Sequence, residues 1–301
     1  MTQKIKITFL GTSGAFPTSK RNHPAFLLNY SGENILVDCG EGTQRQFRKA
    51  KLNPGKITKL LITHWHGDHV LGIPGLLQSL SLSGYNKTLF IYGPKGIEQH
   101  MKNLLKAFPS YNNIKIEIKE VSKEKFFESD EFYIESEIME HGTLCNAYNF
   151  VIKDKLRIDK IKLKKLKIPE GKHLSELLKG KKITLNKKTY KTKDLTYIEK
   201  GKKVSFVLDT LDNKKIAPFV KEAKLLIIES TFASNEEELA KEHKHMTVKQ
   251  SCEEAKKAKV ENLALVHISD RYEDNFSGIL NEAKEIFKKT FIPKDLDEFE
   301  I

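Results

Sequence analysis

Three histidines and an aspartate crowd into the seven residues 63–69, with the spacing His64, His66, Asp68 and His69. Neutral imidazole and carboxylate are the ligands that zinc and similar divalent ions prefer. The apolar residues 60–62 just before the cluster predict a short buried strand. Because a strand sends successive side chains to opposite faces, these four side chains can converge only on the loop beyond it. The spacing therefore predicts a metal site at the end of a strand.

Three further polar residues stand directly after apolar, strand-like runs. His141 follows the alternating residues 132–138, Asp209 follows the run 204–208, and His267 follows residues 263–266. A lone His or Asp after a strand is usually a cap or turn residue. On residue type and position alone, the role of these three residues stays open between such a structural role and metal binding.

The spacing of the first cluster resembles the H-x-H-x-D-H signature of the metallo-β-lactamase superfamily. The resemblance implies an α/β fold, the four-layer αββα sandwich. It also implies two Zn²⁺ ions per subunit, with Mn²⁺ as the alternative. His64, His66 and His141 would then hold one ion, Asp68, His69 and His267 the other, and Asp209 would bridge them. Two adjacent cations can clamp a phosphate and activate a water molecule.

Further motifs resemble the RNase Z family within that superfamily, in the same order along nearly the whole chain. They are Gly11-Thr12-Ser13-Gly14 with Pro17 and Arg21-Asn22, the segment D-C-G-E-G-T-Q at 38–44, E-S-T-F at 229–232, H-M-T at 245–247, and H-I-S-x-R-Y at 267–272. This resemblance implies a zinc-dependent endoribonuclease. Such an enzyme cuts the 3′ trailer from precursor tRNA after the discriminator base, leaving a 3′-hydroxyl on the tRNA and a 5′-phosphate on the trailer.

The RNase Z resemblance also suggests individual roles. Asp68 would orient or deprotonate the water, His245 would act as general acid, and Glu229 would orient His245. His245 could instead be an ordinary loop histidine, Arg271 a structural ion pair and Tyr272 a core residue. The candidates for contacts to RNA near the cut are Arg21, Asn22, Thr43, Gln44, Arg271 and Tyr272.

The net charge of +12 is concentrated in one segment. Residues 153–203 hold 19 Lys and Arg against 6 Asp and Glu, whereas the remaining chain holds 33 and 34. Such a block is either a solvated lysine-rich face or an arm that binds a polyanion. Its apolar content looks too small for a core, so we expect a flexible arm inserted into one domain of residues 1–301. The arm resembles the RNase Z exosite that grips tRNA, with Pro169, Gly171, Lys179 and Lys181 as candidate contacts.

The rest of the sequence bears on the fold class, the cellular compartment and the oligomeric state. Strand and helix patterns mix throughout, which indicates an α/β or α+β protein. No run is apolar enough to span a bilayer, and three widely spaced cysteines suit a reducing compartment, so we expect a cytoplasmic protein. RNase Z proteins of this length form homodimers, and the resemblance implies the same here. The rival hypotheses are a small-molecule phosphodiesterase or thioester hydrolase of the same fold, and an RNA-binding protein with a structural metal site.

Overall fold

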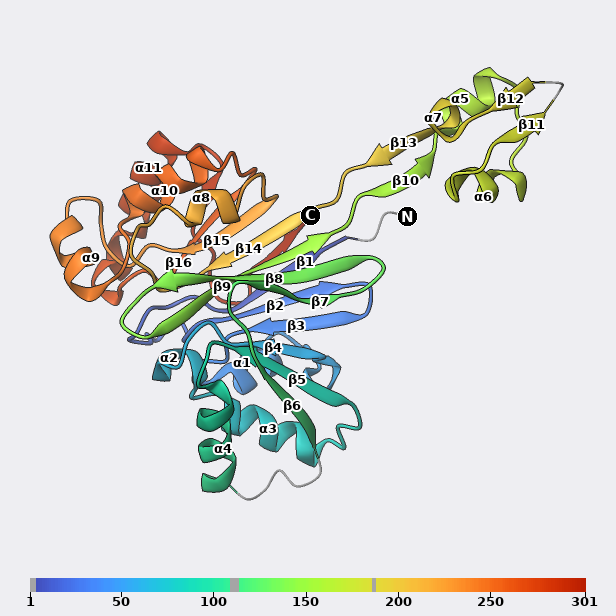
Figure 1. The fold of residues 1–301 in the computed structure, drawn as a ribbon. Coiled ribbons are helices and arrows are strands. Elements are labelled where there is room, and N and C mark those ends of the chain that lie inside the picture. The colour runs from blue at the N-terminus through green and yellow to red at the C-terminus, as the bar shows by residue number, and fades with distance from the viewer. Residues whose placement is uncertain (1–3, 109–113, 186–187) are drawn as a thin grey trace. The chain divides into compact units, whose positions relative to one another are not determined.

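The computed structural model describes residues 4–108, 114–185 and 188–301. The chain divides into two compact units (Figure 1). Unit 1 comprises Met1–Glu128, Ile134–Phe150 and Lys203–Ile301, and unit 2 comprises Ser129–Tyr133 and Val151–Lys202.

Two seven-stranded sheets form the centre of unit 1. The first has the order β18-β1-β2-β3-β4-β5-β6, with β1 antiparallel to both β18 and β2, β2 antiparallel to β3, and β3 to β6 parallel. Its strands are β1 (Lys6–Gly11), β2 (Ala25–Tyr30), β3 (Glu33–Val37), β4 (Lys59–Leu61), β5 (Thr88–Gly93), β6 (Lys115–Glu120) and β18 (Glu298–Glu300).

The second sheet has the order β17-β16-β15-β14-β9-β8-β7, and β14 to β17 run parallel. Its strands are β7 (Glu124–Glu128), β8 (Phe132–Glu140), β9 (Leu144–Ile152), β14 (Lys203–Val207), β15 (Leu225–Glu229), β16 (Leu263–Val266) and β17 (Thr290–Phe291). In both sheets the chemistry-bearing residues predicted from the sequence follow strand ends, which is where sheets collect their sites.

The two sheets pack face to face through aromatic side chains. The ring centroids of Phe26 on β2 and Phe206 on β14 lie 6.2 Å apart, and those of Phe9 on β1 and Phe291 on β17 lie 6.1 Å apart. Such pairs add to the burial of apolar area that holds a sandwich together.

Helices cover the outer face of each sheet (Figure 1). Buried apolar faces of α1, α3 and α4 join the core of the first sheet, and those of α8, α10 and α11 join that of the second. This αββα arrangement is the one that the resemblance to the metallo-β-lactamase superfamily implied. The helices of unit 1 are α1 (Thr43–Lys49), α2 (Gly67–Val70), α3 (Ile73–Leu82), α4 (Ile97–Ala107), α8 (Ile216–Phe219), α9 (Glu237–His243), α10 (Val248–Lys257) and α11 (Phe276–Ile286).

Unit 2 has a small core of its own. Seven buried side chains pack together: Leu163, Ile168, Leu174, Leu177, Ile183, Tyr190 and Leu195. The expectation that this segment lacks apolar content for a core was therefore wrong, because seven apolar side chains from its helices and strands meet in the interior although several others, such as Ile161 and Ile198, are exposed. Its elements are β10 (Lys155–Ile158), α5 (Lys160–Lys165), α6 (His173–Leu178), β11 (Ile183–Leu185), β12 (Lys188–Tyr190), α7 (Thr192–Leu195) and β13 (Thr196–Glu199).

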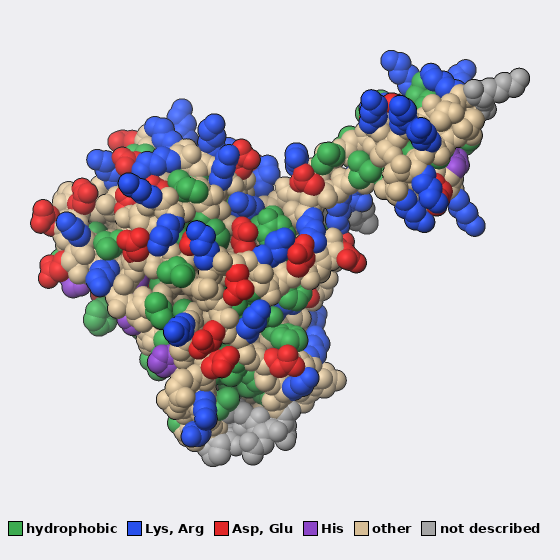
Figure 2. All heavy atoms as spheres, in the orientation of Figure 1, with side chains coloured by type: hydrophobic (Ala, Val, Ile, Leu, Met, Phe, Trp, Pro, Cys, Tyr) green, Lys and Arg blue, Asp and Glu red, His purple; other side chains and the backbone are tan. Residues whose placement is uncertain are grey.

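The surface of unit 2 is basic. Figure 2 shows Lys and Arg side chains spread over the face of this unit that the view presents. Exposed lysines of α5 include Lys160, Lys162, Lys164 and Lys165.

In the described residues, no helix is long and apolar enough to cross a membrane.

Candidate metal centre

All seven predicted ligands lie together in unit 1. His64 and His66 follow β4, Asp68 and His69 belong to α2, His141 follows β8, Asp209 comes after β14, and His267 follows β16. Two groups form, each with its ligand atoms within 4.8 Å of one another. One holds His64, His66, His141 and Asp209, and the other holds Asp68, His69, Asp209 and His267.

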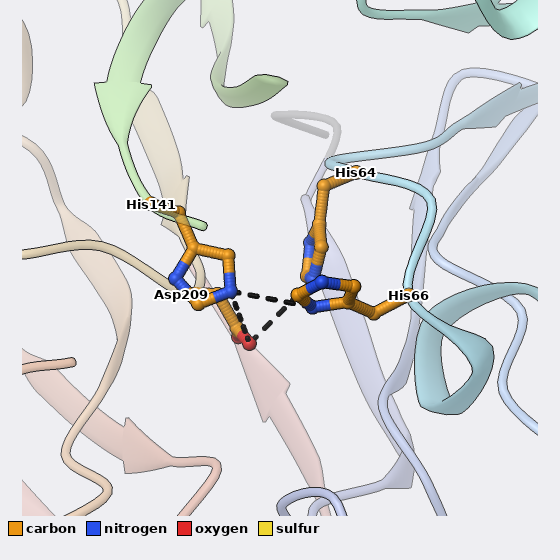
Figure 3. A group of neighbouring side chains, drawn as sticks. All are labelled: His64, His66, His141 and Asp209. Carbon is orange, nitrogen blue, oxygen red and sulfur yellow. Dashed lines mark hydrogen bonds and ion pairs between the residues drawn. The ribbon is translucent and has the colours of Figure 1, made fainter. Parts of the chain in front are cut away.

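The first group approaches a common point from opposite sides, as Figure 3 shows. His141 enters from the end of β8, and His64 and His66 enter from the loop after β4. His64 Nε2 and His141 Nε2 lie 3.6 and 3.8 Å from Asp209 Oδ2, and His141 Nε2 lies 3.3 Å from His66 Nδ1. These separations leave room for one ion between the donor atoms.

The second group shares the other oxygen of Asp209. His69 Nε2 and His267 Nε2 each lie 3.4 Å from Asp209 Oδ1 and 3.3 Å from Asp68 Oδ2. Because one carboxylate presents Oδ2 to the first group and Oδ1 to the second, Asp209 stands between the two halves of the site.

Three donor atoms at the centre are buried without a hydrogen-bond partner among the described residues: His64 Nε2, His69 Nε2 and Asp209 Oδ1. An unsatisfied buried polar atom costs about 1–3 kcal/mol, so native proteins rarely leave several at one point. Imidazole nitrogens and carboxylate oxygens are the donors of divalent zinc-type ions. The side chains thus fit a pair of such ions, which would satisfy these atoms.

The electrostatics of the cluster also favour bound cations. Burial lowers the pKa of His64, and the neighbouring imidazoles lower it further, which keeps it in the neutral form that binds metal. Burial acts in the same direction on His69, but three carboxylates overcome it and raise the His69 pKa well above its ordinary value. These carboxylates are Asp209, Asp38 and Asp68. Their combined negative charge draws positive charge into the site.

A second layer of hydrogen bonds orients the ligands. His69 Nδ1 donates to Asp38 Oδ2 at 2.7 Å, so its Nε2 faces the centre. Thr231 Oγ1 lies 3.0 Å from His267 Nδ1, and the carbonyl oxygen of Lys244 lies 2.9 Å from His141 Nδ1. Partners of this kind fix the ring orientation and the tautomer of a ligating histidine.

Sequence reasoning assigned no role to Asp38, although it opens one of the motifs. Asp38 is fully buried and also accepts from the backbone N–H and the hydroxyl of Thr63, each at 2.8 Å. A buried carboxylate directly after a strand could have been noticed as a further candidate.

Three of the central residues have left-handed backbones. The φ angles of Asp38, Asp209 and His267 are 56°, 36° and 56°. Non-glycine residues rarely adopt this conformation, and it persists only where the surrounding structure enforces it. Each of the three residues lies within two positions of the end of a strand, β3, β14 or β16.

His245 and Glu229 form a pair beside the second group. His245 Nδ1 lies 3.0 Å from Glu229 Oε1, and its ring stacks at 5.4 Å from that of His267. Burial lowers the pKa of His245, but the Glu229 carboxylate outweighs it and raises the pKa to about 9. Glu229 is itself held by the Thr231 hydroxyl at 2.6 Å and the Thr210 N–H at 2.6 Å. The arrangement can hold a protonated imidazole next to the metal centre.

Three of the predicted RNA contacts are turned into the protein. Arg21 Nη1 donates to Thr12 Oγ1 at 2.6 Å and to the Pro293 carbonyl at 2.7 Å. Asn22 donates its side-chain amide to the Glu41 carbonyl, and the hydroxyl of the fully buried Thr43 donates to the Gly40 carbonyl at 2.7 Å. These bonds hold the loops around the site, and contact of the three residues with RNA stays a prediction.

The other predicted contacts lie nearer the surface. Gln44 is exposed and donates to Ser79 Oγ. Arg271 is exposed and lies 3.4 Å from Glu236, while the Tyr272 hydroxyl accepts from the Ala233 N–H at 3.2 Å. Tyr272 also packs against the core of the second sheet, as the alternative interpretation expected. In unit 2, Pro169, Gly171, Lys179 and Lys181 are all exposed.

Comparison with solved structures gives the fold class of the protein. The fold matches human tRNase Z, short form (TM-score 0.72, 24% identity, 98% of each chain), and the metallo-β-lactamase fold protein YhfI from Bacillus subtilis (TM-score 0.72, 21% identity, 100% of each chain). The protein therefore has a metallo-β-lactamase fold. A family model described as anti-Pycsar protein Apyc1 matches residues 5–200, so the chain also belongs to the family that this model describes.

Sequence similarity then gives the family. The chain is 37% identical to a ribonuclease Z of Nanoarchaeum equitans, over 98% of this chain and 92% of that protein. It is 38% identical to a ribonuclease Z of Nitrosopumilus maritimus, over 99% and 100%. The chain belongs to the ribonuclease Z family.

Proposed function

We propose that this protein is a metal-dependent endoribonuclease that removes the 3′ trailer of precursor tRNA after the discriminator base. The products would be a tRNA 3′-hydroxyl and a trailer 5′-phosphate. The observation that carries the proposal is the pair of donor groups sharing Asp209, with three buried atoms that lack a partner among the described residues. Full-length similarity to proteins named ribonuclease Z supports the choice of substrate.

The residues divide naturally between two ions. His64, His66 and His141 would hold the first, and Asp68, His69 and His267 the second, with Asp209 contributing to both. Zinc suits this mixture of imidazole and carboxylate, and manganese is the alternative. When bound, two such cations neutralise charge on a phosphoryl group and lower the pKa of water, the chemistry that phosphodiester hydrolysis needs.

The chain's own residues would handle the protons and the orientation. Asp68 Oδ2 lies at the centre of the second group and would orient the attacking water. His245 would donate a proton to the departing 3′-oxygen, since Glu229 favours its protonated form. Glu229 would keep the His245 ring in place through the bond at Nδ1, which leaves Nε2 as the atom able to donate.

Unit 2 would bind the body of the tRNA. Its excess of Lys and Arg suits the phosphate backbone, and phosphate contacts are independent of base sequence. Pro169, Gly171, Lys179 and Lys181 are exposed, and the two lysines, which pair with Glu176 at 3.3 and 2.5 Å, would exchange these exposed ion pairs for phosphate contacts. We further propose that the protein acts as a homodimer in the cytoplasm. Three buried free cysteines, Cys39, Cys145 and Cys252, suit that reducing compartment, and sedimentation equilibrium tests the dimer.

The test is incubation of the purified protein with a 3′-extended tRNA and Zn²⁺, with mapping of both product ends. We expect one cut after the discriminator base and no cutting in EDTA. Cleavage that persists in EDTA would refute metal dependence. A protein that hydrolyses short nucleotides but leaves the precursor intact would instead be a small-molecule phosphodiesterase, and one that binds the precursor without cutting it would be an RNA-binding protein.

A further inference from the structure

A phenylalanine is strongly exposed in a loop beside the metal centre. Phe16 lies between β1 and β2, and 71% of its surface is open to solvent. Isolated exposed apolar residues are common and indicate nothing by themselves. Two properties distinguish Phe16 from the other exposed apolar residues. The backbone of its loop is fixed by hydrogen bonds, and the loop contacts residues of the candidate metal centre.

The loop backbone is anchored on both sides of the ring. The Ser13 hydroxyl donates to the Phe16 carbonyl at 2.6 Å, and the Ala15 carbonyl lies 3.1 Å from His23 Nε2. Beyond the ring, the Thr18 N–H donates to the Arg21 carbonyl at 2.9 Å. A loop held in this way presents the Phe16 ring at a fixed place, so its exposure is not the result of a loose chain.

The same loop touches ligands of the second donor group. The N–H of His267 donates to the Thr12 carbonyl at 3.2 Å, and a Cβ atom at Gly14 would lie 3.6 Å from the His267 ring. At the end of the loop, His23 packs against Gly40, which in turn packs against the backbone of Asp68, because a Cβ atom at Gly40 would overlap both the His23 side chain and the Asp68 carbonyl oxygen. Phe16 is therefore two residues along the chain from Gly14, which packs against the ring of His267.

The distance suits a nucleotide next to the cut. Consecutive Cα atoms are about 3.8 Å apart, so the Cα of Phe16 lies within about 8 Å of that of Gly14. Stacked nucleotides rise by about 3.4 Å each. A phosphate bound at the donor groups would thus bring its neighbouring base within reach of the ring.

We infer that Phe16 is a positioning residue whose ring stacks on a base flanking the scissile phosphate. This inference rests on the proposed function. An aromatic face binds any base without reading its identity, which suits an enzyme that must process many different precursors. Stacking would hold the strand while the metal centre and His245 act on the phosphodiester.

The first test compares kcat/KM for precursor tRNA among Phe16→Ala, Phe16→Trp and the matched control Leu82→Ala. Leu82 is 82% exposed at the last residue of α3, so its loss removes a similar side chain at another place in unit 1. Stacking contributes about 1–3 kcal/mol per base, which corresponds to about 5- to 150-fold. We expect Phe16→Ala to lose that factor, Phe16→Trp to recover it, and Leu82→Ala to match the wild type.

The second test removes the base instead of the ring. Precursors with an abasic discriminator nucleotide or an abasic first trailer nucleotide distinguish the two flanking positions. When the base at the stacked position is missing, kcat/KM of the wild type should fall by the same factor that Phe16→Ala loses on the intact precursor. The kcat/KM of Phe16→Ala should not fall further when that base is removed. A 2-aminopurine at that position, bound in EDTA so that no cutting occurs, should fluoresce more brightly with Phe16→Ala than with the wild type.

Wild-type efficiency of Phe16→Ala on the intact precursor would overturn the inference. So would a loss of equal size on the intact precursor and on both abasic precursors. Either result leaves wild-type cleavage, and hence the proposed function, standing. If the wild type itself fails to cut the precursor, the proposed function falls first and this inference falls with it.

Discussion

Replacement of Asp38 by asparagine should weaken the second metal position without removing a ligand. The Asp38 carboxylate accepts three hydrogen bonds, from His69 Nδ1 at 2.7 Å and from the N–H and hydroxyl of Thr63 at 2.8 Å. An asparagine has only one oxygen to offer. If its amide nitrogen faces His69, the ring must give up the Nδ1 proton, and the proton on Nε2 then blocks metal binding.

The alternative orientation of the introduced amide is no better. With the amide oxygen turned to His69, the amide nitrogen faces the Thr63 N–H, which leaves a buried donor unsatisfied at about 1–3 kcal/mol. Loss of such an outer partner typically costs about 10- to 100-fold in metal affinity. We therefore expect zinc to bind the second position about 10- to 100-fold more weakly, or about 1.4–2.7 kcal/mol.

Zinc titration against a competing chelator measures this affinity at both positions. Asp295→Asn is the control, because this partly buried carboxylate also accepts several bonds, including those from Thr12 Oγ1 at 2.8 Å and the Asn22 N–H at 2.7 Å. It should lower thermal stability while leaving the zinc affinity of the second position near that of the wild type. Unchanged zinc binding by Asp38→Asn would show that Asp38 does not orient His69.

Three other predictions concern turnover and RNA binding. His245→Ala should keep its metal, measured by elemental analysis, but lose about 10²- to 10⁴-fold in turnover, and normal turnover of the metal-loaded variant would exclude it as the general acid. Residues 153–203 can be replaced by a short linker because the two ends of the segment are close together, with the Ile152 N–H bonded to the Lys202 carbonyl at 2.8 Å. The replacement should abolish precursor cleavage while sparing hydrolysis of a small phosphodiester. Loss of both activities would mean that unit 2 is needed for folding. The double variant Lys179→Ala and Lys181→Ala should make the salt dependence of precursor binding shallower by about 0.9 per lost phosphate contact in log–log slope, whereas an unchanged slope would remove these lysines from the interface.

Local patterns indicated a mixture of helices and strands and located several strands of the two sheets, but they gave no sign of β9. Residues 144–152 place Asn146 and Asn149 among apolar neighbours, which obscures the alternation typical of a strand. Both side chains are buried and find acceptors, Asn146 at the Val121 carbonyl and Asn149 at the Phe219 carbonyl, each at 2.8 Å. Sequence alone does not reveal acceptors that lie 25 and 70 residues away.

The candidate metal centre likewise combines residues that the sequence marks with residues that only the tertiary structure reveals. Four of its residues lie close together in the sequence, and three more stand after apolar runs. Residue type and spacing marked these positions, and the resemblance to the metallo-β-lactamase superfamily implied that all seven are ligands. The residues that orient them did not stand out, because Asp38 reaches His69 across 31 positions and Thr231 reaches His267 across 36. Such pairs arise only when strand ends meet at one edge.

Residue types and spacing by themselves determined a candidate metal site, a mixed class of helices and strands and the location of the basic segment, whereas the layers of the fold were implied by the resemblance of the motifs to the metallo-β-lactamase superfamily. These properties depend on the type of each side chain and on the face it occupies, which short-range spacing encodes. Only the tertiary structure decided which polar groups face inward. It buried Arg21, Asn22 and Thr43 in structural hydrogen bonds, exposed Phe16 and built a core within unit 2, because burial depends on neighbours that distant segments supply.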